Sequence, residues 1–150
     1  LERDRHKKIV QSLKKLSTNI KFISDGDVVG AIYSCLDEFN VDMYIGIGGA
    51  PEGVLAAAAI KCFDGQFQGR LVISNHDEKL RATKLGISDF SKKYYLNDMV
   101  KGDVIFCAAG VTDGELLKGI EISKNFFTSE ILSLHSKEKI IKKYQEKIEI

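Results

Sequence analysis

Along the first half of the chain, apolar residues recur by turns at helical spacing and in short strand-like runs. Ile9, Leu13 and Leu16 lie three or four positions apart among lysines, which predicts an amphipathic surface helix over 5–16. The next four predicted elements are a strand at 20–23, a helix at 28–36, a strand at 41–47 and a helix at 51–63. This order is typical of a parallel sheet with helices packed over it.

The second half of the chain has a different pattern. Residues 78–85 predict a largely polar helix, and the apolar run 104–108 predicts a buried strand. Paired apolar residues beyond position 120 predict an antiparallel meander, while 139–148 fits a final strand or a helix equally well. We therefore expect a single domain over 1–150 of the α/β class: a layered mixed sheet with helices on both faces.

A glycine-rich turn at 46–53 joins the predicted strand 41–47 to the alanine-rich helix that follows. Pro51 suits the first turn of a helix, where its missing N–H costs nothing. Bare N–H groups and the positive end of the helix dipole favour an anion such as phosphate at this point. Glu52 falls in the same turn, and its carboxylate fits two roles, a helix cap or a ligand of a hard metal ion.

A second polar loop, Asp25-Gly26-Asp27, follows the predicted strand 20–23. Loops at the carboxyl ends of parallel strands gather at one edge of a sheet, where ligands bind. We therefore expect this loop and the glycine turn to meet. Asp25 and Asp27 also suit the ordinary role of helix caps.

Composition narrows the classes of partner. The 150 residues carry a net charge of +1 with no basic stripe among aromatics, so nucleic acid is not expected. No apolar run reaches the length of a membrane helix and no signal segment is evident, so we expect a cytoplasmic location. Cys35, Cys62 and Cys107 each lie in an apolar run and predict buried free thiols, without any zinc-like spacing.

With these stretches side by side, the chain resembles the C-terminal half of class II fructose-1,6-bisphosphatases, a branch of the metal-dependent, lithium-sensitive phosphatases. The matching stretches are 24–28, 44–54, 69–71, 104–106 and 110–114. The chain also begins at Leu1 directly in helix-like sequence, which indicates a piece of a longer protein.

The resemblance implies hydrolysis of the 1-phosphate of fructose 1,6-bisphosphate, a step of gluconeogenesis, with Mg²⁺ or Mn²⁺. It implies that Glu52 binds the metal, and that a further group of residues binds the sugar phosphate: Arg3, Asp4, Arg5, Asp25, Gly26, Asp27 and Gly49. The family usually has proline where Asp4 stands. The remaining metal ligands belong to the N-terminal half, so the catalytic residues are not assigned within this chain, and a homo-oligomer is expected.

Other polar residues have simpler interpretations. Thr112 and Asp113 are typical of a turn with an Asx cap, and Arg70 suits a surface ion pair, although it could also bind phosphate. Two alternatives to the bisphosphatase stay open. One is an incomplete remnant that binds sugar phosphate without turnover; the other is a phosphatase for a related sugar or inositol phosphate.

Overall fold

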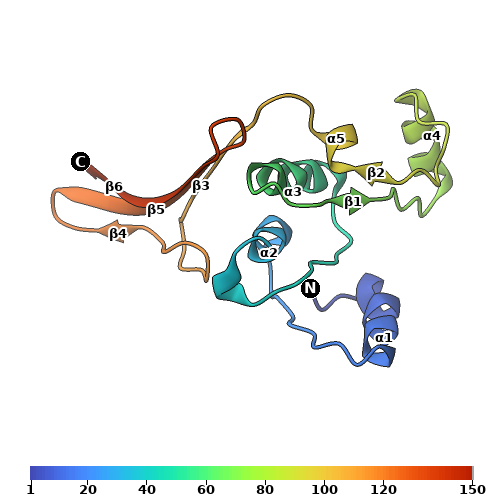
Figure 1. Ribbon diagram of the computed structural model, residues 1–150, viewed down its shortest axis with the longest axis horizontal. Helices are drawn as coiled ribbons and strands as arrows, with labels where there is room; N and C mark the ends of the chain where they lie inside the picture. The colour runs from blue at the N-terminus through green and yellow to red at the C-terminus, as the bar shows by residue number, and fades with distance from the viewer. Residues whose placement is uncertain (150) are drawn as a thin grey trace.

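The computed structural model describes residues 1–149, which form helices, a two-stranded antiparallel sheet and, to one side, a four-stranded antiparallel sheet (Figure 1). The helices are η1 (Asp4–His6), α1 (Lys7–Lys15), α2 (Asp27–Tyr33), η2 (Asp37–Phe39), α3 (Ala50–Cys62), α4 (His76–Lys84) and α5 (Leu96–Met99). The strands are β1 (Gln68–Gly69), β2 (Tyr94–Tyr95), β3 (Ile105–Ala109), β4 (Glu121–Ile122), β5 (Phe126–His135) and β6 (Ile140–Glu149). Among these residues, no helix combines the length and apolar character needed to cross a membrane.

The helices lie close to their predicted positions. α1, α3 and α4 begin and end within a few residues of the ranges expected from the sequence pattern. α2 is shorter than predicted: it ends at Tyr33, and the Ser34 hydroxyl donates to the Ala31 carbonyl at 2.7 Å as the chain turns away. Small residues on the facing surfaces, including Ala31 of α2 and Ala56 of α3, let these two helices pack closely.

The larger sheet confirms the predicted antiparallel meander and the α/β class. β5 lies at its centre, with β3 and β4 along one edge and β6 along the other, and every pairing is antiparallel. The ambiguous segment 139–148 therefore forms a strand, β6. α3 packs against β3 and β5 on one face, where Leu132 and Leu134 are buried beside Ala59 and Cys62.

The predicted parallel strands at 20–23 and 41–47 are wrong: neither segment is paired as a strand within 1–149. Residues 41–46 form no backbone–backbone hydrogen bond in this part of the chain. Ile23 and Tyr44, one from each segment, instead pack on α2: a Cβ added at Gly30 would lie 2.6 Å from the Ile23 side chain and 2.7 Å from the Tyr44 ring. An apolar run identifies a segment that packs on a neighbour, and it does not identify a strand to pair with.

Candidate functional site

The glycine turn ends in a helix cap made by Glu52. Gly49 has extended backbone and precedes the first residue of α3, with Pro51 in the first turn as predicted. The Gly49 N–H donates to Glu52 Oε2 at 3.1 Å. The carboxylate of Glu52 therefore occupies the positive end of the α3 dipole, where the sequence favoured an external anion. A carboxylate has several acceptor positions, so this cap leaves Glu52 able to bind a cation as well.

Asp27 lies beside the same turn. Gly26, with φ of +82°, turns the chain into α2, and Asp27 is the first residue of that helix rather than its cap. A Cβ added at Gly48 would lie 2.7 Å from Asp27 Oδ2 and 3.1 Å from Glu52 Oε2. The expected meeting of the two loops is thus confirmed, although the strands expected to bring them together are not formed. Two carboxylates lie against one glycine.

Tyr44 fixes the orientation of Asp27. Its hydroxyl donates to Asp27 Oδ1 at 2.7 Å. The ring fits into space left by Gly30 and Gly46, since a Cβ at Gly46 would lie 2.6 Å from the Tyr44 hydroxyl oxygen. Burial of the ring, and next the hydrogen bond to Asp27, raise the pKa of Tyr44 well above its usual value. Sequence reasoning missed this role; the glycines that make room for the ring were its only signal.

The N-terminal turn η1 is attached to the glycine loop through Ile47. Arg5 Nε donates to the Ile47 carbonyl at 2.6 Å, and the Ile47 N–H donates to His6 Nε2 at 2.9 Å. His6 Nδ1 lies 2.6 Å from the Leu1 carbonyl, so the neutral ring that carries its proton on Nδ1 satisfies both contacts. His6 is buried. Arg5 and His6 therefore bind both backbone polar groups of Ile47, the residue directly before Gly48. Sequence reasoning did not single out His6.

Three other predicted substrate-binding residues, Arg3, Asp4 and Asp25, are exposed. Asp4 pairs with Lys7 at 2.7 Å, and both side chains are exposed. Arg3 contacts the carbonyl of Glu2 at 3.5 Å, and Asp25 is exposed in the loop before α2. Within residues 1–149, no hydrogen bond ties Arg3 or Asp25 to the Gly48 loop.

Five polar or thiol side chains lie outside this site and were also interpreted from the sequence. Asp113 accepts a hydrogen bond from the Gly119 N–H at 2.9 Å, so it closes a wider turn than the predicted Asx cap, which bonds the backbone two residues on. Arg70 forms no ion pair in the described part of the chain, so the predicted surface pair is wrong. Cys62 is buried and Cys35 partly buried, but Cys107 is exposed, because alternate residues of β3 point away from the helices.

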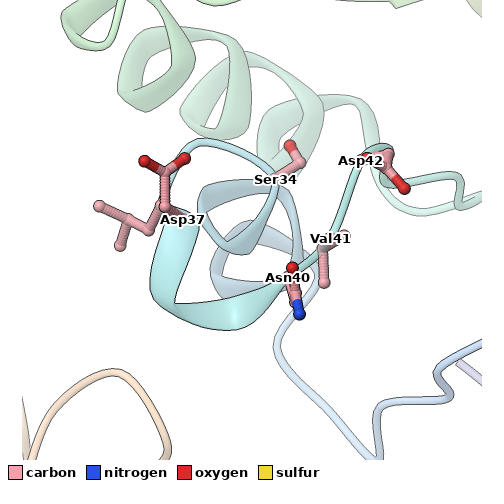
Figure 2. A pocket seen from close by; sticks show the side chains of 6 residues that line it. Ser34, Asp37, Asn40, Val41 and Asp42 are labelled. Atoms are coloured by element: carbon pink, nitrogen blue, oxygen red, sulfur yellow. The ribbon is translucent and has the colours of Figure 1, made fainter.

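Two hollows of the surface are shallow and lie away from Gly48. One, of about 300 Å³, is lined by Gln68, Gly69, Arg70 and Lys93. The other, of about 260 Å³, surrounds the turn after α2, where Asp37 and Asp42 point in different directions (Figure 2). Over residues 1–149 no three His, Cys, Asp or Glu side chains gather as a metal site would require. Asp27 and Glu52 supply hard oxygen donors of the kind that Mg²⁺ and Mn²⁺ prefer, but not a complete set.

Comparison with known proteins places this geometry in context. The family model described as "Bacterial fructose-1,6-bisphosphatase, glpX-encoded" matches residues 1–148. The chain is 36% identical over 159 aligned positions to the class 2 fructose-1,6-bisphosphatase of Haemophilus influenzae, and 37% identical over 160 to fructose-1,6-bisphosphatase 1 class 2 of Escherichia coli K12. Each alignment covers 97% of this chain and 47% of the relative, so the chain spans about half the length of these relatives.

Proposed function

Because the chain belongs to the glpX-encoded bacterial fructose-1,6-bisphosphatase family, we propose that it contributes to hydrolysis of the 1-phosphate of fructose 1,6-bisphosphate. In this proposal the chain supplies substrate-binding loops and one metal-binding carboxylate. The part of the relatives that this chain does not span supplies the remaining metal ligands and the groups that position water. A cytoplasmic location and a role in gluconeogenesis belong to the same proposal.

The observation that carries the proposal is the position of two carboxylates against Gly48, directly after the residue that Arg5 and His6 hold. Phosphate monoesters hydrolyse extremely slowly unaided, so an enzyme must neutralise charge and activate water. Membership of the family implies a divalent metal cofactor, and we propose Mg²⁺ or Mn²⁺. When bound, such an ion neutralises the phosphate and lowers the pKa of a coordinated water.

The proposed roles follow from where each residue lies. Glu52 binds the metal, because its carboxylate is fixed by the α3 cap and lies against the open glycine. The loop Asp25-Gly26-Asp27 and Gly49 bind the sugar phosphate beside it. Arg3 and Arg5 add positive charge for the dianion, with Asp4 withdrawn into its pair with Lys7.

A chimera that joins this chain to the remaining part of the E. coli relative tests these roles. We expect Glu52→Gln to lower phosphate release at saturating Mg²⁺ or Mn²⁺ by about a hundredfold or more, by analogy with loss of a metal-site group. Glu78→Gln is the matched control, because Glu78 also sits at the third position of a helix and accepts from a backbone N–H, that of Ser74, at 2.7 Å. Undiminished turnover by the Glu52 variant would remove Glu52 from the mechanism.

A second function, binding of sugar phosphate without turnover, is favoured by the lack of a third carboxylate or imidazole at the Gly48 site within 1–149. Calorimetric titration of the chain with fructose 1,6-bisphosphate, with and without Mn²⁺, examines it. Binding without phosphate release by the chain and by the chimera would support this function. Metal-dependent hydrolysis by either would exclude it.

A further inference from the structure

Asp27 has only one of its two carboxylate oxygens free to meet a ligand. Its Oδ1 accepts a hydrogen bond from the Tyr44 hydroxyl at 2.7 Å. Its Oδ2 accepts no hydrogen bond within residues 1–149, and a Cβ added at Gly48 would lie 2.7 Å from it. Gly48 is exposed, so a ligand from solvent can reach this oxygen. The bond to Tyr44 therefore decides where the free acceptor of Asp27 points.

The ring of Tyr44 is held firmly enough to act as a fixed donor. A Cβ added at Gly30 would lie 2.7 Å from the ring, and one added at Gly46 would lie 2.6 Å from the hydroxyl oxygen. The ring also packs against a buried cluster that includes Ala31 of α2 and Ala56 of α3, two helices that lie side by side (Figure 1). A carboxylate without such a donor turns readily about its last torsion angle.

The charge of Asp27 selects the part of a sugar phosphate that its free oxygen can contact. A carboxylate repels a phosphate dianion, whereas it accepts a hydrogen bond from a hydroxyl group. Asp27 Oδ2 therefore suits a hydroxyl of the sugar rather than an oxygen of its phosphate groups.

Resting on the function proposed above, in which the loop Asp25-Gly26-Asp27 binds the sugar phosphate, we propose that Tyr44 is a positioning residue for this substrate. It holds Asp27 so that Oδ2 accepts a hydrogen bond from a hydroxyl of the sugar, and it acts through Asp27 without contacting the substrate itself. When the phenolic hydroxyl is removed, ordering of the carboxylate is left to the substrate, so affinity for the sugar falls. Contacts made only with phosphate are unaffected.

Steady-state hydrolysis by the chimera at saturating Mn²⁺ tests this role. We expect Tyr44→Phe to raise KM about tenfold with kcat within about twofold, because it removes an interaction made equally in the ground state and the transition state. The inhibition constant of inorganic phosphate should stay within about twofold, whereas a disturbance of the whole glycine turn would weaken both ligands. Tyr33→Phe is the matched control: Tyr33 is buried in α2, its hydroxyl makes no hydrogen bond within 1–149, and both constants should stay unchanged.

Two further variants connect the effect to Asp27. Gly46→Ala places a methyl group where the Tyr44 hydroxyl lies, so it should reproduce the rise in KM while the hydroxyl itself is kept. In Asp27→Ala the carboxylate is absent, and adding Tyr44→Phe should then change KM by less than about twofold, because the two residues act as one unit.

Three outcomes would overturn the inference and leave the proposed hydrolysis in place: an unchanged KM in Tyr44→Phe, equal losses for the sugar and for inorganic phosphate, or a full further loss in the double variant. A chimera that binds fructose 1,6-bisphosphate without releasing phosphate would contradict the proposed hydrolysis instead. The same comparisons, made as dissociation constants by calorimetry, would then decide the role of Tyr44. A chimera that binds no fructose 1,6-bisphosphate would overturn both.

Discussion

At the scale of single residues, the candidate site depends on side chains that each make two interactions. Glu52 caps α3 and faces Gly48, while Asp27 begins α2, accepts from Tyr44 and faces the same glycine. These interactions hold the carboxylates in place before any ligand binds, so less conformational entropy is lost on binding.

Tyr44 gives this arrangement a measurable pH dependence. Burial and the bond to Asp27 raise its pKa in the folded chain above the value near 10 of the unfolded chain. The folded state therefore holds this proton more tightly, and its stabilisation is complete below about pH 10 and is lost as pH rises above it. We expect the free energy of unfolding to fall more steeply by up to about 1.4 kcal/mol per pH unit above pH 10 than in Tyr44→Phe.

Urea unfolding at pH 8, 10 and 11 measures this difference, with the remaining tyrosines and lysines titrating in both proteins. Tyr44→Phe also leaves Asp27 Oδ1 without its donor, so a moderate loss of stability at pH 8 is expected. Parallel pH profiles for the two proteins would show that folding does not raise the pKa of Tyr44.

At the scale of elements, the sequence predicted those helices and strands whose formation depends on a local pattern of residues. The helices follow from apolar spacing, from Pro51 at the start of α3 and from alanine content, all of which act within a few residues. The meander was predictable because paired apolar residues recur along the segment beyond position 120. The strand predictions at 20–23 and 41–47 failed because pairing depends on partners far along the sequence, which a short apolar run does not specify.

The site was predictable to the same degree. Asp27, Gly49 and Glu52 lie at the starts of α2 and α3, where the preceding glycines mark them, and the two turns do meet. The contribution of His6 could not be predicted, because it joins η1 to a residue 41 positions away and a single histidine has no local signature.

The attachment of η1 and α1 through His6 is testable as an element. His6→Ala removes the acceptor for the Ile47 N–H and the contact with the Leu1 carbonyl, leaving two partly buried polar groups unpaired. We expect a loss of about 1–3 kcal/mol in the free energy of unfolding and faster hydrogen exchange at the Ile47 amide. His76→Ala, at the exposed start of α4, should leave both unchanged. Unaltered exchange at Ile47 in His6→Ala would show that η1 does not hold the glycine loop.

At the scale of the whole molecule, apolar side chains near the candidate site are left open to solvent. Met43 is 63% exposed in the segment before the glycine turn, and Val54 and Leu55 are 44% and 53% exposed in α3 just beyond Glu52. The relatives are about twice as long as this chain. We therefore expect the part of the relatives that this chain does not span to cover this surface, beside Glu52, the proposed metal ligand.

Leu55→Ser distinguishes such a surface from an ordinary exposed leucine. In the chain alone Leu55 is already half in solvent, so the substitution should cost little. In the chimera with the E. coli part, full burial should make the same substitution cost about 1–2 kcal/mol more in the free energy of unfolding. Leu85→Ser is the control, because Leu85 is 81% exposed beyond the end of α4. Equal costs for Leu55→Ser in the two proteins would mean that the added part packs elsewhere, and the carboxylates at Gly48 would then lack the neighbour that the proposed hydrolysis requires.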